Sequence, residues 1–207
     1  MASLEHLSLF ARDYFGFYPH LDLSNLYFPR LMTLSLGNFC FFHDRQIDWI
    51  LKHGDTLEEI YLDDCTILYD FCMMDYNVEH CGLPRSALAR RIGDDVSVYG
   101  SYGKRWHDIF DLFAEKLPKL RYFRIGSGYW FDGVPFEQED EIKPGLYYNR
   151  YMACYDGFGP SPYMERAPGE DGIEKGWWQK RPECDEEDRA ALRRLLGKIG
   201  QSIEEIP

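Results

Sequence analysis

The chain has 207 residues, of which 45% are hydrophobic, 16% aromatic and 28% charged, a balance typical of a soluble globular domain. Its formal charge of −12 repels phosphate backbones and anionic lipid headgroups, so we expect neither a nucleic acid nor a membrane partner. No apolar run reaches the roughly 18 residues of a membrane helix. Six dispersed cysteines without a C-x-x-C pair favour free thiols over disulfides, and a cytoplasmic or nuclear location.

The first predicted element is a strand in residues 4–15, where Leu4, Leu7 and Leu9 fit the frame L-x-x-L-x-L of leucine-rich repeats. The same frame returns in three further segments, residues 31–41, 57–65 and 120–128. The steps from Leu4 to Leu31 and from Leu31 to Leu57 are 27 and 26 residues, within the roughly 20–29 residues of this repeat class. The fourth copy follows Leu57 by 63 residues, which leaves room for an insertion.

Helices are predicted between or after these strands, in residues 43–54, 104–118 and 184–200, because apolar side chains recur there at helical spacing. Asp44 is expected to cap the first helix, and Gly54 to take the left-handed conformation past its end. Pro118 stops the second helix and Gly200 the third.

These elements predict an α/β fold, a leucine-rich-repeat solenoid of about four to five repeats that forms one domain over residues 1–207. A short parallel sheet would lie on the concave side, with helices outside. The fifth strand would begin in QSIEEIP at the end of the chain. Two long insertions, about 68–103 and 129–183, would interrupt the repeats, and segments of this length are usually functional or disordered.

A protein-binding site is predicted on the concave face of the sheet. Because side chains alternate along a strand, Leu57, Ile60, Leu62 and Cys65 should be buried while the residues between them face outward. Strands in register would align Ser8, Ser35, Tyr61 and Arg124. The predicted surface, polar, aromatic and acidic, suits a basic or hydroxyl-rich peptide and comprises His6, Ser8, Phe10, Thr33, Ser35, Glu59, Tyr61, Asp63, Tyr122 and Arg124.

No catalytic residue, metal site or cofactor is predicted. His43 with Asp44 and His80 with Cys81 lack the spacing of zinc ligands, and GFGPSP at 157–162 lacks the lysine of a phosphate loop. The chain is therefore expected not to be an enzyme. The alternative is a small hydrolase or transferase with its site in the aromatic insertions, around Tyr147, Arg150, Asp156 and Trp177.

The segments FPRLMTLSLGNFCFFHDRQIDWILKHGDTLEEIYLDDCTILYD, RWHDIFDLFAEKLPKLRYFRIGSG and GLYYNRYMACYDGFGPSPY together resemble the C-terminal leucine-rich part of fungal F-box proteins. The resemblance implies recognition of a protein substrate for a ubiquitin ligase. It implies a ligase adaptor as partner only if an F-box lies outside this chain, since nothing before Leu4 could hold one. A truncated fragment without an independent role is a further alternative.

Overall fold

A computed structural model describes residues 3–18, 20–90, 96–128, 139–157 and 179–202. Its strands are β1 (His6–Phe15), β2 (Thr33–Phe41), β3 (Glu59–Asp63), β4 (Thr66–Met74), β5 (Ser97–Ser101), β6 (Tyr122–Ser127), β7 (Lys143–Pro144) and β8 (Tyr151–Gly157). The α-helices are α1 (Asp44–Leu51), α2 (Trp106–Lys116) and α4 (Asp185–Ile199), with short 3-10 helices η1 (Asp75–His80), η2 (Arg85–Ala87), η4 (Glu139–Glu141) and η5 (Tyr148–Arg150).

The four strands with the recurring leucine frame pair as predicted. β1, β2, β3 and β6 lie side by side and parallel, and Leu7, Leu34, Ile60 and Phe123 stand opposite one another across them. The side chains of Leu57, Ile60, Leu62 and Cys65 are all buried, which confirms the inward half of the predicted pattern. The fifth predicted strand, at residues 203–207, lies outside the described residues.

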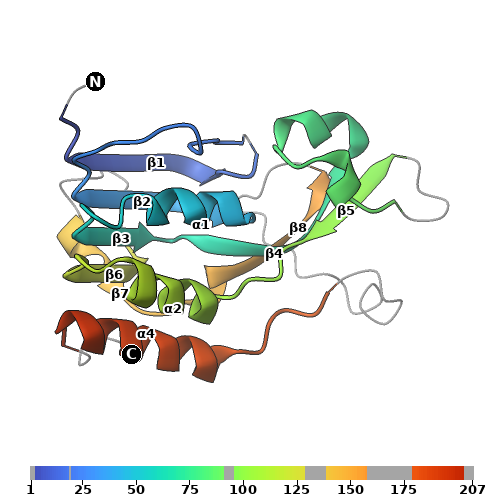
Figure 1. Cartoon of the computed structure of the whole chain (residues 1–207). Coiled ribbons are helices and arrows are strands. Elements are labelled where there is room, and N and C mark those ends of the chain that lie inside the picture. The colour runs from blue at the N-terminus through green and yellow to red at the C-terminus, as the bar shows by residue number, and fades with distance from the viewer. Residues whose placement is uncertain (1–2, 19, 91–95, 129–138, 158–178, 203–207) are drawn as a thin grey trace.

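All three predicted helices are present, on one side of these strands (Figure 1). Their predicted apolar stripes face the sheet, where Ile47, Trp106, Phe110 and Leu195 are completely or almost completely buried. Gly200 ends α4, as predicted, and has a left-handed backbone conformation.

Two predicted details of α1 are wrong. Its N-cap is His43, whose side chain accepts a hydrogen bond from the Arg45 backbone N–H, while Asp44 is the first helical residue. The Gln46 side chain in turn accepts a hydrogen bond from the His43 backbone N–H, which completes a capping box. Gly54 has no left-handed backbone; its Cα lies so near the Lys116 carbonyl oxygen that a Cβ there would be 2.6 Å from it, and this close approach explains the glycine.

The leucine-rich-repeat solenoid is wrong, because the sheet is a mixed one of eight strands. After β3 the chain does not turn away, as a repeat would. It continues as β4, which pairs with the end of β2, runs parallel to β8 and is antiparallel to β5. β7 adds a second antiparallel edge beside β6. Strands therefore form inside both predicted insertions, and β4 has eight of nine residues buried, as expected of a strand covered on both faces.

Two hydrophobic cores lie on opposite faces of this sheet. The larger fills the space between the helices and the sheet, with Trp106, Phe110 and Phe123 at its centre. The smaller covers the other face of β4, β5 and β8, where Phe17 packs on Phe71 and Phe42. Across the described ranges, every helix is too short or too polar to cross a bilayer.

Candidate functional site

The predicted binding residues lie on the sheet face opposite the helices and line up as expected. Strand pairing places His6, Thr33, Glu59 and Tyr122 in one row across β1, β2, β3 and β6. It places Ser8, Ser35, Tyr61 and Arg124 in the next, as predicted. We call the first set, at the amino ends of the four strands, the amino-terminal row.

The predicted exposure of this face is wrong for three residues. Ser35, Tyr61 and Asp63 are 0%, 7% and 1% exposed, whereas His6 is exposed and the other predicted residues are half-buried. Part of the cover comes from the segment before β7: the buried Glu139 carboxylate lies 3.0 Å from the His6 imidazole. The leucine frame contains no signal for this cover, because it comes from a distant segment of the chain.

Glu59 is the centre of the amino-terminal row. Its Oε2 accepts hydrogen bonds from the Thr33 hydroxyl (3.3 Å) and the Tyr61 hydroxyl (3.4 Å), and its Oε1 accepts one from Arg121 (3.3 Å). The Tyr61 and Tyr122 rings lie 5.3 Å apart. The row is thus an ordered, half-exposed strip with aromatic and carboxylate character.

A second polar group, not predicted as a unit, lies where the four parallel strands end. We call it the crease cluster: Tyr14, Asp63, Asp64, Ser127 and Asn149. Asn38 in β2 and Asp64 after β3 both have a positive φ, at 56° and 47°, and they follow the paired residues Gly37 and Asp63. The pairing of β1 with β2 is also irregular at this level, between Phe10 and Phe15. Backbone irregularities in three adjacent strands therefore fall on one line, which we call the crease.

Hydrogen bonds join several chain segments at the crease. Asn149 donates to the Tyr14 hydroxyl (3.1 Å) and to Asp64 (2.9 Å). The Ser127 hydroxyl donates to Asp64 (3.0 Å), and the Gly128 backbone N–H donates to Asp63 (2.5 Å). The sequence signal for this cluster is the pair Asp63–Asp64 at the end of a buried strand, where parallel sheets commonly bind ligands.

Burial dominates the ionisation of these groups. Loss of hydration, and then the charge of Asp64, raises the pKa of Asp63 to about 7. Burial raises the pKa of Asp64 as well, against hydrogen bonds from Asn149 and Ser127 that lower it. The pKa of the Tyr14 hydroxyl also lies above its ordinary value, chiefly because of burial. Near neutral pH the crease therefore contains two adjacent carboxyl groups that resist carrying two charges.

Comparisons with known proteins bear on the predicted family. No family model, curated protein or solved structure matches the chain. The resemblance to the leucine-rich part of F-box proteins stays a prediction.

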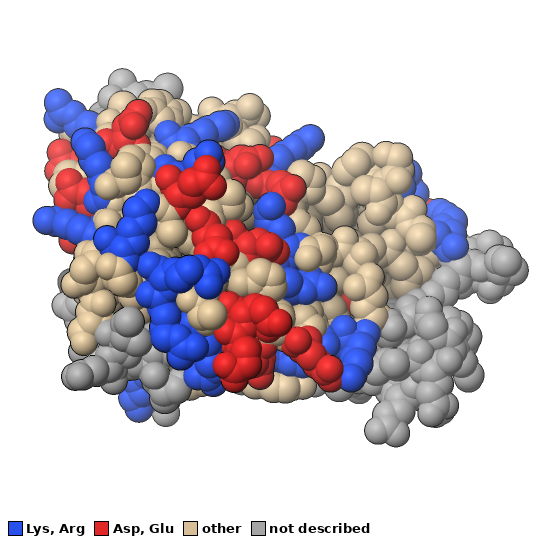
Figure 2. All heavy atoms as spheres, turned by 60° about the horizontal axis from the view of Figure 1, so that its bottom comes forward, with Lys and Arg blue, Asp and Glu red and all other residues tan. Residues whose placement is uncertain are grey.

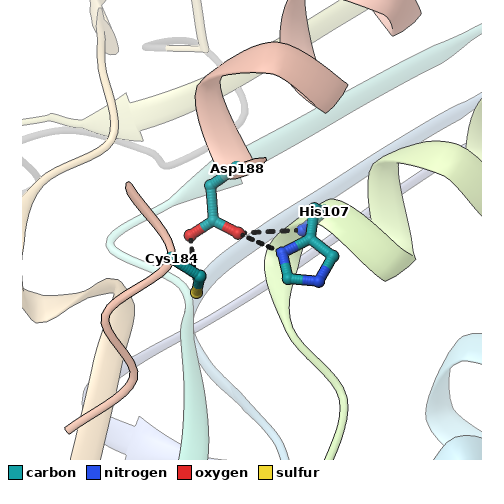
Figure 3. A group of neighbouring side chains, drawn as sticks. All are labelled: His107, Cys184 and Asp188. Carbon is teal, nitrogen blue, oxygen red and sulfur yellow. Dashed lines mark hydrogen bonds and ion pairs between the residues drawn. The ribbon is translucent and has the colours of Figure 1, made fainter. Parts of the chain in front are cut away.

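A third group contains residue types that bind metals. His107 in the first turn of α2, and Cys184 and Asp188 at the start of α4, have potential ligand atoms within 4.8 Å of one another (Figure 3). Zinc is bound by such a set of nitrogen, sulfur and oxygen ligands. Neither of the histidine pairs considered from the sequence belongs to this group.

The contacts of Asp188 do not fit a metal ion. This fully buried carboxylate accepts hydrogen bonds from the His107 backbone N–H (3.0 Å), the His107 ring (2.9 Å) and the Tyr151 hydroxyl (2.9 Å). The Arg150 guanidinium, 3.3 Å away, already balances its charge. The Cys184 thiol already donates a hydrogen bond to the Tyr151 hydroxyl (3.3 Å). The group is a hydrogen-bonded hub that holds α4 against α2 and β8.

Two residues of the enzyme alternative have described side chains, Tyr147 and Arg150, and the Arg150 guanidinium donates to the Tyr147 carbonyl (3.2 Å). Arg150 is 7% exposed and forms ion pairs with Asp188 and Asp185. The Tyr147 hydroxyl donates to the Lys143 carbonyl (3.4 Å). The side chain of Asp156, and all of Trp177, lie outside the described residues. Both described members therefore have structural contacts of their own.

An apolar cavity of about 30 Å³ lies between α1 and the connection of β1 to β2, walled by Leu21, Leu36, Phe39 and Trp49. The amide of Gln46, on its polar side, is already bonded to backbone groups of the chain. The cavity is too small for a ligand much larger than water.

The helical side of the molecule carries charges of both signs. Figure 2 shows acidic side chains in a band over this face, with basic side chains on both sides of it. Several are paired across elements, such as Arg194 with Asp111 (2.8 Å) and Lys104 with Asp44 (3.4 Å). Charges of mixed sign that neutralise one another give this face no strong field of one sign.

Proposed function

We propose that this protein binds another protein or a peptide through the amino-terminal row, and that it does so without catalysis. The observation that carries the proposal is the strand register, which brings His6, Thr33, Glu59 and Tyr122 together on the sheet face that the helices leave free. Four residues from distant parts of the chain thereby form one contiguous surface.

The chemistry of the row indicates the kind of partner. Tyrosine rings provide large, rigid contact areas and are enriched at protein interfaces. Glu59 and Glu139 supply carboxylate oxygens beside the rings of Tyr122 and His6. A segment with hydroxyl or basic side chains would complement the carboxylate character of the row, in keeping with the acidic composition of the chain.

Two finer expectations belong to the same proposal. The F-box resemblance adds a ubiquitin-ligase adaptor as a partner if an F-box lies outside these residues. A cytoplasmic or nuclear location fits six cysteines that are free thiols in the described residues.

Site-specific photo-crosslinking tests the proposal. A photoreactive phenylalanine replaces Tyr122 in one form of the protein and Glu115, an exposed residue on α2, in the control form. We expect Tyr122 to crosslink a discrete protein that unlabelled wild-type chain displaces and that a Glu59→Gln, Thr33→Val competitor displaces at least about fivefold less well. Equal crosslinking from both positions, or equal displacement by both competitors, would rule the row out as the binding surface.

A further inference from the structure

At the crease, a pair of acids lies between two parts of the sheet: β1, β2, β3 and β6 on one side, and β4, β5 and β8 on the other. Three consecutive residues at the end of β6 bind the Asp63–Asp64 dipeptide: the Gly126 carbonyl accepts the Asp64 N–H (2.8 Å), and Ser127 and Gly128 donate to the two carboxyl groups. On the other side, Asn149 ties Asp64 to the start of β8. These two side chains thus tie the end of β6 and the segment before β8 to the junction of β3 and β4.

No cation balances the pair among the described residues. The two carboxyl groups accept hydrogen bonds from uncharged donors: a backbone N–H, a hydroxyl and an amide. Asp63 is 1% exposed, so water does not screen it. Two neighbouring buried carboxylates repel each other and lose hydration, and such pairs retain a proton.

Among the described residues at the crease, burial raises the pKa of both acids, and that of Asp63 reaches about 7. The titratable groups that face them are Tyr14 from β1, Cys40 from β2 and Cys65 from the turn before β4. Burial raises the pKa of each of these three groups, so they stay uncharged. β6 and the start of β8 contribute Ser127, Gly128 and Asn149, which do not titrate.

We propose that the crease is a proton-controlled joint: the buried Asp63–Asp64 pair holds one proton while Ser127, Gly128 and Asn149 are bound to it, and loss of that proton leaves two adjacent buried charges that favour opening, against the three hydrogen bonds. The direction follows from linkage, because a pair that binds a proton more tightly when closed than when open must open more readily as the pH rises. The joint requires no ligand and is independent of the proposed protein-binding row.

Support comes from the pKa of Asp63, about 7, against an ordinary value of 3.8. In the open state the carboxyl groups regain water and return toward ordinary pKa values. The transition therefore falls within the range of pH found in cells.

Hydrogen–deuterium exchange of the whole protein between pH 5.5 and 8.5 tests the joint, after correction for the pH dependence of intrinsic exchange. In residues 126–128 and 149–151 we expect protection to decline by up to about tenfold per pH unit, the value for one proton, from about pH 5.5 to about 7 and to level off at higher pH. The decline arises because the open state has already lost the proton in this range, whereas the closed state loses it only near pH 7. Residues 44–51 of α1 serve as the internal control and should show no such decline.

Asp63→Asn removes the titrating group but keeps an oxygen for Gly128, so it should abolish most of the decline; Asp111→Asn, at an exposed ion pair, should leave it as in the wild type. An infrared band of a protonated carboxylic acid, present at pH 5.5 and absent at pH 8.5, gives a second measurement in the wild type if the Asp63→Asn chain does not fold. Protection that does not depend on pH, or an unchanged decline in Asp63→Asn, would overturn the proposal, as would absence of the infrared band at pH 5.5.

Discussion

Tyr151 donates a hydrogen bond to Asp188, 37 residues later in the chain, across a distance of 2.9 Å in the interior. The same hydroxyl accepts the backbone N–H of Trp106 at 2.8 Å, so one tyrosine connects β8, α2 and α4. Burial, and then a hydrogen bond with Cys184, raises the pKa of Tyr151 and keeps it a donor.

Removing the carboxylate of this hub should be costly. Asp188→Ala leaves the Arg150 guanidinium buried without its fully buried counter-charge, and we expect a loss of about 3–5 kcal/mol in the free energy of unfolding. Urea denaturation measures it. Asp111→Ala breaks an exposed ion pair with Arg194 and should cost no more than about 1 kcal/mol. Similar losses in the two variants would contradict the role assigned to Asp188.

Zinc should not stabilise the protein through the hub. The oxygens of Asp188 already accept several hydrogen bonds, and the neighbouring guanidinium repels a cation. We expect an equimolar amount of Zn²⁺ to leave the Tm of the wild type and of Cys184→Ser unchanged within about 1 °C. A stabilisation of about 1 kcal/mol would raise the Tm by more than this. A rise of several degrees in the wild type that Cys184→Ser abolishes would show that the group binds metal.

Stability should depend on pH through Asp63. Its folded pKa, about 7, lies above the ordinary 3.8, so the folded state binds the proton more tightly. The contribution to stability is fully present below about pH 4 and is lost as the pH rises toward 7. At about 1.4 kcal/mol per pKa unit, Asp63→Asn should gain about 2–3 kcal/mol relative to the wild type between pH 5 and pH 8. Urea titrations at both pH values measure this difference, and parallel pH profiles would refute it.

Two glycines should respond oppositely to alanine. A Cβ on Gly126 in β6 would lie 1.9 Å from the Lys143 carbonyl oxygen, so Gly126→Ala must push β7 away and should cost about 1–3 kcal/mol. A Cβ on Gly197 in α4 meets nothing within 4 Å, and Gly197→Ala should stabilise by about 0.5–1 kcal/mol through helix propensity. Thermal unfolding of both variants tests the close approach of β7 to β6, and a neutral Gly126→Ala would count against it.

The sequence was most informative where a pattern repeats. The leucine frame predicted β1, β2, β3 and β6 with their register, and helical spacing predicted α1, α2 and α4. The run TILYDFCMM lies mostly in a predicted insertion, yet it forms a strand, because a largely apolar run of this length fits a strand buried on both faces.

The candidate sites were harder to predict, because burial depends on segments far away in the chain. Alternation correctly placed Asp63 and Tyr61 on the face opposite Ile60 and Leu62. It could not show that Gly128 and Glu139 approach that face from more than sixty residues away. The crease cluster depends in the same way on Asn149, which has no sequence pattern of its own.

Beyond the crease, β4 and β8 contribute to both hydrophobic cores, and this sharing affects how the molecule unfolds. β4 sends Ile67 and Tyr69 into the larger core and Leu68 and Phe71 into the smaller one. β8 is shared in the same manner, with Tyr151 on one side and Met152 on the other. Melting either core exposes strands that the other requires, so heat should unfold the described part of the chain in a single cooperative transition.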